Sequence, residues 1–557
     1  MNFVEEMAIV LRSLLRQQIP SLSEELLQEC RIWLKLAFFN GMRSLSELLP
    51  WIISLVFVGK VSVDELAALS LAETWLYSFM LVNWIGSEMT QSTLVSQAHG
   101  QRSIIAMRGW TLISFITMSI LNIFIAALAL SYVPVLLALH FDHETVLLGE
   151  HWAYLSIPVL FTEAFVICSS NYLVSSQIYW QPTVVELVRI FIDAPLSYIF
   201  IFGCGREHFG RLDNPLVGCA VAWLIGSLSS CILNCVLVRY YWNKELQYGH
   251  IADDASTDDV VVDSDCTKST LKSSLLDVQF IHPSDYEVEA NGKINKADNY
   301  NHSILRTHEN SDGLADATMN TDATMSSVLQ WALANNRIRS HGYLALPNLF
   351  FAFTFCFNYF VLAILAAKLG NTILCAHNLC ISLFHVIASI SAGMGEATSV
   401  RVGFHVGCGD IPGAKRVTNI SILFGMTWGV ILCISMYLLR HVVTHIMVGN
   451  SDVQSQMLSI IPIMSVSYVV VTISDMSLAI LEGQGRASEQ ALSFCIGTWI
   501  VGVTLALISF FCTNLGLVGI WLSSLAGNIV TLVLASHFVT RSNWSVIIAE
   551  SKERIDS

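Results

Sequence analysis

Residues 67–100 decide the fold, and they read "AALSLAETWLYSFMLVNWIGSEMTQSTLVSQAHG". The first part, 67–85, is almost entirely apolar, and together with the residues that follow it is long enough to cross a bilayer, which takes about 20 helical residues. The second part carries Glu88, Gln91 and Ser92. Because the bilayer core offers such groups no water, we expect them to face something other than lipid. The stretch therefore predicts a membrane helix with one face on a polar interior.

The same apolar pattern recurs along the whole chain. Of its 557 residues, 54% are hydrophobic and only 13% are charged, and the mean hydropathy is +0.59. A soluble protein carries about 25% charged residues. We therefore predict an all-α integral membrane protein with twelve transmembrane helices, at 36–58, 67–94, 109–133, 151–173, 183–203, 216–238, 343–367, 376–400, 418–440, 457–481, 490–511 and 516–538.

The net charge of −14 is concentrated in one segment. Residues 245–322 hold sixteen acidic and five basic residues and almost no aromatic ones. Low hydrophobicity combined with high charge is typical of disordered segments. We interpret residues 241–335 as an acidic, disordered linker, so the charge says little about ligands, and we expect no nucleic acid among the partners.

Basic residues are distributed unevenly among the loops between these helices. With the N-terminus in the cytosol, alternation assigns thirteen basic residues to the cytosolic side and five to the other side, as the positive-inside rule requires. We therefore expect both termini and the linker to be cytosolic, and the plasma membrane to be the location, with an internal membrane as the alternative. The predicted organisation is a cytosolic N-terminal segment, an N-lobe, the linker, a C-lobe and a cytosolic tail, at 1–35, 36–240, 241–335, 336–540 and 541–557.

The two halves of the chain repeat each other. "LVGCAVAWLIG" at 216–226 and "LVGIWLSSLAG" at 517–527 share Leu-Val-Gly and a later Leu and Gly at matching offsets. "KVSVDELAALSL" at 60–71 aligns with "KLGNTILCAHNL" at 368–379. We infer two pseudo-symmetric six-helix lobes in the same orientation. Parallel repeats of this kind are typical of transporters that bind substrate between the repeats.

The motifs in these segments resemble a known transporter family. They include "FVGKVSVDELAALSLA" (57–72), "TLVSQAHG" (93–100), "SAGMGEATSVRVGFHVGCGDIPGAKR" (391–416) and "LEGQGRASEQAL" (481–492). In this order they resemble the eukaryotic branch of the multidrug and toxic compound extrusion (MATE) family. The resemblance implies two lobes that open alternately to either side of the membrane. It also implies export of organic cations, or of conjugated organic compounds, driven by inward flow of protons or sodium.

Two acids are displaced by one helical turn from the positions that the resemblance implies. Family members usually carry an acid where this chain has Ser92, and here the carboxylate is at Glu88. In the tenth helix the usual acid falls at Val471, and here it is at Asp475. Residues four apart share one helix face. The displaced acids are therefore expected to line the same cavity wall.

Other acids of the eukaryotic pattern are missing. Two glutamates of the seventh helix align with Phe355 and Phe360, and one of the eighth helix aligns with Ser382. The polar groups that remain there are Thr354, Asn358, Ser382 and His385. This departure leaves open whether the ordinary coupling to protons is retained.

A cavity carboxyl group can hold a proton in one state and exchange it for a cationic substrate in the other, because desolvation favours the neutral acid and a nearby cation favours the carboxylate. We expect ion coupling by Asp475, Glu88 and Glu163. Substrate contacts are expected from Gln91, Ser92, Asn358, Phe355, Tyr359, Ser382 and His385, with the aromatic rings available for cation–π stacking. For each acid the alternative is a buried group that is hydrogen-bonded and takes no part in transport.

Two arginines within predicted helices need partners, because an unpaired charge is costly in the membrane. Arg43 and Glu47 are four residues apart, as are Arg189 and Asp193. We expect both to pair along one helix face. Glu396 is expected near the cytosolic end of the eighth helix, where it serves either helix packing or transport.

These observations predict an antiporter that exports organic, cationic compounds in exchange for protons. The alternatives are sodium coupling, or a non-transporting, degenerate paralogue that acts through its cytosolic loop. A flippase for lipid-linked glycans would need a basic cavity, and the inward positions show little Arg or Lys. No enzyme motif is present. We expect no cofactor and no metal, the lipid bilayer as surroundings, and a monomer.

Overall fold

The computed structural model describes residues 20–138, 140, 142–203, 210–256 and 325–556, and every regular element within them is a helix. The first half comprises α2 (Pro20–Gly59), α3 (Val63–Gly100), α4 (Ile104–Leu130), α5 (Tyr132–Ala138), α6 (His143–Ser175), α7 (Trp180–Phe202) and α8 (Pro215–Ser256). A short helix, α10 (Met325–Ala332), precedes the second half. The second half comprises α11 (Asn335–Leu369), α12 (Asn371–Cys408), α13 (Ile411–Met447), α14 (Ser451–Gly483), α15 (Ala487–Cys495), the π-helix η2 (Ile496–Val503), α16 (Thr504–Cys512) and α17 (Gly516–Thr540), and α18 (Trp544–Asp556) follows it.

The contacts divide the chain into two units. Residues 1–243 and 323–557 form one unit, and residues 244–322 form the other. Only the end of α8 is described in the smaller unit. The helix packing and the candidate site below belong to the larger unit.

Twelve long helical segments lie within the described residues, as predicted. Eleven of them are long and apolar enough to span a membrane, and α15, η2 and α16 together make one of these. The twelfth is α7, which has 23 residues but carries Glu186, Arg189 and Asp193. The expected all-α membrane fold is confirmed. The span expected at 490–511 differs in being interrupted by the π-helical turns of η2.

Several helices extend beyond the expected boundaries. α2 already begins at Pro20, because Trp33 and other side chains before residue 36 are buried against the second half. α8 continues to Ser256, and α10 forms within the segment expected to be a disordered linker. α10 is stabilised by the edge-on contact of Trp331 with Trp110 of α4, whose ring centroids are 5.1 Å apart. The remainder of the expected linker, 257–324, lies outside the described residues.

Polar side chains and glycines set the ends of the helices. The Ser62 hydroxyl accepts a hydrogen bond from the backbone N–H of Glu65 at the start of α3, and Asn450 caps α14 in the same way. Such caps satisfy backbone donors that the first turn leaves unpaired. Gly409 ends α12 with φ 77°, a left-handed conformation that glycine adopts without strain.

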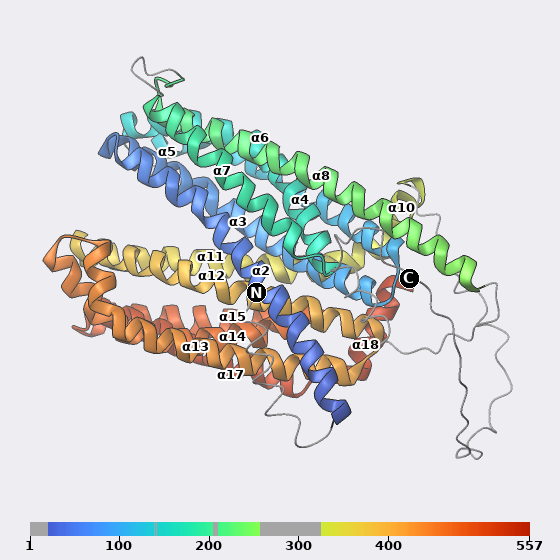
Figure 1. Ribbon diagram of the computed structural model, residues 1–557. Coiled ribbons are helices and arrows are strands. Elements are labelled where there is room, and N and C mark those ends of the chain that lie inside the picture. Colours follow the sequence, from blue (N-terminus) through green and yellow to red (C-terminus); the bar gives the residue numbers. More distant parts are fainter. Residues whose placement is uncertain (1–19, 139, 141, 204–209, 257–324, 557) are drawn as a thin grey trace, which may run out of the picture. The chain divides into compact units, whose positions relative to one another are not determined.

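The two halves have equivalent packing, as the sequence repeat predicts. In the first half α3 packs against α6, and in the second half α12 packs against α14. The halves meet through their first two long helices: α2 packs against α12, α11 packs against α3, and α3 also contacts α12. Figure 1 shows the first half in blue to green and the second half in yellow to red. The interface between the halves is thus built by α2, α3, α11 and α12.

Glycines allow helices of different halves to approach backbone to backbone. A Cβ atom added at Gly393 of α12 would lie 2.1 Å from the backbone nitrogen of Gly41 in α2. Where α3 ends, a Cβ at Gly100 would lie 2.1 Å from the Phe404 carbonyl oxygen, and one at Gly407 would lie 2.1 Å from the Gln97 carbonyl oxygen. Small residues are the usual means of such close packing in membranes. We call Gly100 and Gly407 the glycine contact.

Replacing Gly100 with alanine is expected to destabilise the protein, because the new methyl group meets backbone atoms that cannot rotate away. Overpacking of this kind costs about 1–3 kcal/mol. Thermal unfolding of the purified chain in detergent measures the effect. Gly342→Ala is the matched control, since a Cβ there has nothing within 4 Å. Equal unfolding temperatures for the two variants would contradict the packing described here.

Candidate functional site

Three carboxylates from three helices share one arginine at the interface between the halves. Nη1 of Arg43 in α2 donates to Glu47 at 2.8 Å, one turn further along the same helix. Nη2 of Arg43 donates to Glu88 of α3 at 2.9 Å and to Glu396 of α12 at 2.8 Å. The predicted pair of Arg43 and Glu47 is confirmed, and it belongs to a larger group. We call these four residues the Arg43 cluster.

The Arg43 cluster combines three carboxyl groups with one guanidinium group. With all four groups ionised, three carboxylates face one guanidinium. The Arg43 side chain is buried, whereas 30% of the Glu88 side chain and 43% of the Glu47 side chain are exposed. A partly exposed carboxylate next to a buried arginine can release the arginine and bind instead a cation or a proton that comes from outside the cluster. Glu88 therefore meets the geometric requirement of the predicted coupling residue.

The surrounding helices hold the cluster in position. Asn171 of α6 donates from Nδ2 to the Glu88 backbone carbonyl at 2.7 Å. The close approach of Gly41 and Gly393 brings α2 and α12 together two and three residues away from Arg43 and Glu396. Because Arg43 and Glu88 come from one half and Glu396 from the other, any separation of the halves must break at least one of these ion pairs.

A second arginine binds three acids inside the first half. Arg189 of α7 lies 2.5 Å from Glu163 of α6, 3.4 Å from Asp193 and 3.6 Å from Glu186. The predicted pair of Arg189 and Asp193 is confirmed. All four side chains are almost fully buried. Glu163, the third expected coupling residue, is thus held in an ion pair with Arg189. The Arg189 group lies within electrostatic range of the Arg43 cluster, because the charge of Arg43 acts on Glu186.

A third group lies in the second half around Tyr359 of α11. The His385 ring of α12 meets the Tyr359 ring edge-on at 4.8 Å between centroids, and Phe355 meets it edge-on at 5.5 Å. Asp475 of α14 is half-buried, and its charge acts on Tyr359. Within the described residues Asp475 forms no hydrogen bond or ion pair. Four of the predicted residues, Asp475, Tyr359, Phe355 and His385, are therefore brought together.

The remaining predicted residues lie elsewhere. Gln91 is fully buried and donates from Nε2 to the Cys168 carbonyl at 2.7 Å, so it holds α3 to α6 within the first half. Ser92 is buried, and its hydroxyl has no hydrogen-bond partner among the described residues. Asn358 is buried on α11, while Ser382 is exposed on α12. The structure brings none of these four into the Arg43 cluster.

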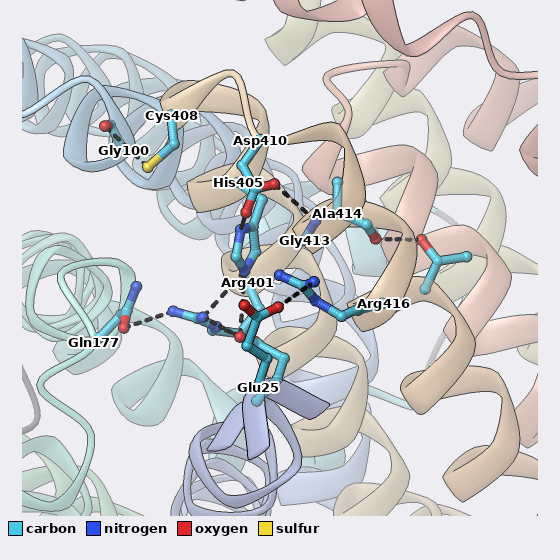
Figure 2. A network of polar contacts seen from close by, with 12 residues as sticks. Glu25, Gly100, Gln177, Arg401, His405, Cys408, Asp410, Gly413, Ala414 and Arg416 are labelled. Atoms are coloured by element: carbon cyan, nitrogen blue, oxygen red, sulfur yellow. Dashed lines mark hydrogen bonds and ion pairs between the residues drawn. The ribbon is translucent and has the colours of Figure 1, made fainter. Parts of the chain in front are cut away.

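The end of α12 carries a polar network that the sequence did not indicate (Figure 2). Arg401 is completely buried and donates from Nε and Nη2 to the two carboxylate oxygens of Glu29, both at 2.7 Å. Its Nη1 donates to Gln177 at 2.9 Å. Gln177 lies in the turn between α6 and α7 and has φ 63°. Arg401 therefore ties α12 to both α2 and a turn of the first half.

His405 continues this network to the start of α13. Its Nδ1 lies 2.9 Å from Asp410, and its Nε2 lies 3.2 Å from Arg401. Asp410 accepts a hydrogen bond from the Gly413 backbone N–H, which caps α13. Burial alone would raise the pKa of Asp410, but the hydrogen bonds from His405 and Gly413 hold it below its usual value.

Further contacts close the two halves at this end. Gln97 of α3 donates to the Gly483 carbonyl of α14 at 3.0 Å, and Arg554 of α18 donates to Gln97 at 2.9 Å. The Cys408 thiol lies 3.3 Å from the Gly100 carbonyl. Together with the glycine contact, these interactions join the ends of α3, α12 and α14. The described helices are closed against each other where α3 and α12 end.

Sequence reasoning missed the roles of Glu396, Glu29 and Gln177 as partners of arginine. Only pairs three or four residues apart on one helix leave a signal in a single sequence. Glu396 is 353 residues from Arg43, and Glu29 is 372 residues from Arg401. The one available hint is that Arg43 and Arg401 stand within or beside apolar segments, where each charge requires a partner.

A family model described as MatE matches residues 42–199 and 347–508, which is more than half of the chain. The chain belongs to the MatE family. The two matched regions fall one in each half, in agreement with the repeat. Solved structures of MATE transporters have a similar fold. A crystal structure of a eukaryotic MATE transporter superposes with a TM-score of 0.71 over 95% of this chain and 99% of that one, at 16% identity. A MATE structure in a bent conformation gives a TM-score of 0.67 at 15% identity.

Curated relatives include proteins of animals and of a plant. Multidrug and toxin extrusion protein 1 of Oryctolagus cuniculus is 26% identical over 202 residues, and its human counterpart is 26% identical over 201 residues. Protein DETOXIFICATION 30 of Arabidopsis thaliana is 24% identical over 180 residues. These matches cover about a third of this chain and about a third of each relative.

Proposed function

We propose that this protein is a secondary active antiporter that exports organic cations across a membrane in exchange for protons. The observation that carries the proposal is the Arg43 cluster, in which three acids from both halves share one arginine and two of them, Glu47 and Glu88, are partly exposed. Two comparisons support the proposal: the chain belongs to the MatE family, and the name of a curated relative describes it as a multidrug and toxin extrusion protein.

In this proposal Glu88 and Asp475 take up protons and cations in turn. Glu88 changes partner between Arg43 and the substrate, and Tyr359, Phe355 and His385 line the path on the side of Asp475. Glu163 acts through its ion pair with Arg189 inside the first half. The ends of α3 and α12 face the cytosol, the membrane is the plasma membrane, and the protein works as a monomer.

Transport by reconstituted protein tests the proposal. The full chain is placed in liposomes, and uptake of a fluorescent styrylpyridinium cation is followed under an imposed pH gradient or an imposed sodium gradient. Flux that depends on the pH gradient supports the proposal. Flux that depends only on the sodium gradient would show that the coupling ion is sodium and not the proton. Absence of flux for a panel of organic cations would favour a non-transporting paralogue.

Asp475→Asn is expected to abolish exchange while the protein stays folded. Asparagine keeps the shape of the side chain but cannot hold a proton or a negative charge. No arginine among the described residues pairs with Asp475, so its replacement leaves no cation without a partner. The liposome assay measures the loss, and thermal unfolding checks the fold. Asp452→Asn is the control, because Asp452 is exposed in the first turn of the same helix. Unchanged transport by Asp475→Asn would make Asp475 a structural residue.

A further inference from the structure

Helix α18, which the proposed function does not use, lies against helices of both halves. It follows α17 after the three-residue turn 541–543, and with 13 residues it is too short to span a membrane. It packs against α11 and α12. Because its chain continues directly from α17, α18 is attached to the second half through the backbone, whereas it reaches the first half by contacts alone.

Apolar side chains of α18 belong to two different hydrophobic clusters. Ile547 is buried in a cluster built mainly from α12, α13, α14 and α17 of the second half, and Ile548 packs against that cluster. Ile555 lies about two turns further along and packs against a cluster built mainly from α3, α4 and α6 of the first half. The two ends of α18 are therefore held by different halves of the protein.

Hydrogen bonds fix α18 to the end of α3. Gln101, directly after α3, donates from Nε2 to the Ser551 backbone carbonyl at 3.2 Å and lies 3.3 Å from the Ser551 hydroxyl, which is buried. Nη1 of Arg554 donates to Oε1 of Gln97 at 2.9 Å. Gln97 donates in turn from Nε2 to the Gly483 carbonyl at 3.0 Å. Arg554, Gln97 and Gly483 thus connect α18, α3 and α14 in one chain of hydrogen bonds.

The Arg554 guanidinium packs on the turn that follows α14, but its charge is poorly paired. A Cβ atom at Gly485 would lie 2.5 Å from Arg554 Nη1, so the turn leaves no room for a side chain there. The ion pair of Arg554 with Glu550 is long, at 3.7 Å, and 55% of the Glu550 side chain is exposed. Burial lowers the pKa of Arg554, and the charges of Glu550 and Glu553 offset this only in part. Arg554 is therefore easier to undock than a closely paired arginine such as Arg401.

We propose that α18 is a strap that holds the ends of α3 and α14 together, and that Arg554 is the contact at which the strap is released. Any parting of the halves at this end must separate Gln97 from Gly483. Since the backbone attaches α18 to the second half, α18 then also loses Gln101 and the contacts of Ile555. The strap thus adds to the free energy of opening at this end. The inference goes beyond the proposed function, because it concerns the conformation of the chain without substrate or ion gradient.

Hydrogen–deuterium exchange of the purified full chain in detergent tests this proposal, since backbone amides exchange faster where a structure opens more often. Arg554→Met removes the guanidinium and keeps an unbranched apolar side chain. We expect amides in 97–101, 483–487 and 550–556 to exchange about tenfold faster than in the wild type, because losing a hydrogen bond to a charged group changes an equilibrium by about this factor. Lys552→Met is the matched control, since it removes the same charge from an exposed position of the same helix.

Gln101→Leu tests the strap from the side of α3. It leaves the sequence of α18 unchanged and removes the donor to Ser551. We expect faster exchange in the same three segments, by a smaller factor than in Arg554→Met, because the lost hydrogen bond joins neutral groups. This variant decides the proposal if Arg554→Met does not fold.

The proposal is overturned if 97–101 and 483–487 exchange no faster in Arg554→Met than in Lys552→Met. It is also overturned if the faster exchange is confined to α18, which would show that this helix does not restrain α3. An equal increase at 371–377, the opposite end of α12, would overturn it as well, because it would show a loss of overall stability. The same outcomes decide the α3 variant. No transport is measured, so the result is independent of whether the protein exports cations.

Discussion

Arg401→Met is expected to lower the free energy of unfolding by about 3–5 kcal/mol, the usual cost of breaking a buried ion pair by removing one partner. The Arg401 side chain is completely buried, and its loss leaves the Glu29 carboxylate without the two hydrogen bonds it accepts at 2.7 Å. The link to Gln177 is lost with it. Thermal unfolding of the purified full chain in detergent measures the effect.

Arg416→Met is the control for this experiment. Arg416 pairs with Glu25 at 2.8 Å, but 45% of the Glu25 side chain is exposed, and exposed pairs contribute about 0–1 kcal/mol. In addition, the double variant of Glu29→Leu with Arg401→Met is expected to be more stable than Arg401→Met alone, because no buried charge is left unpaired. Equal destabilisation by Arg401→Met and Arg416→Met would contradict the structural role of the network.

Arg43→Met is expected to reduce styrylpyridinium transport at least about tenfold, which corresponds to a change of about 1.4 kcal/mol in the barrier. Without the guanidinium, Glu47, Glu88 and Glu396 lose the ion pairs that join the two halves, and ionised acids there would repel each other. The conformation described above, in which the two halves meet at the Arg43 cluster, then becomes less stable relative to conformations in which the halves are separated there. The liposome assay measures transport, and thermal unfolding separates this effect from loss of the fold.

Arg43→Lys distinguishes charge from geometry. Lysine keeps the positive charge but lacks the planar fork through which Arg43 reaches three acids. We expect transport between that of the wild type and that of Arg43→Met. Arg440→Met is a control, because the Arg440 side chain stacks on the ring of Tyr437 and donates to the Tyr437 carbonyl, and no ion pair of Arg440 is found among the described residues. Wild-type transport by Arg43→Met would show that the cluster is dispensable.

The number and class of the helices were predictable because the bilayer imposes a strict requirement. A spanning helix needs about 20 apolar residues, and apolar runs of that length can be recognised in a single sequence. Even α7, which carries three charged residues, was predicted at 183–203 because its other side chains are apolar. The pairs of Arg43 with Glu47 and of Arg189 with Asp193 were predictable for a similar reason, since helical spacing fixes them.

The partners that join the two halves were not predictable in this way. Which residue meets Arg43 across the interface depends on how α2, α3 and α12 cross, and the crossing depends on close contacts such as that of Gly41 with Gly393. Gln91 illustrates the converse. Its motif predicted a residue facing the cavity, and packing of α3 on α6 places it instead on the Cys168 carbonyl. A helical pattern tells which residues share a face, and only the packing tells what that face meets.

The glycine contact bears on how the protein changes shape. At Gly100 and Gly407 the helices α3 and α12 touch through main-chain atoms, without long side chains that could bend and follow a gradual displacement. A short parting would already uncover main-chain groups along both helices. Intermediate separations are therefore disfavoured, and the ends of α3 and α12 are expected to behave as a latch that is either shut or fully released.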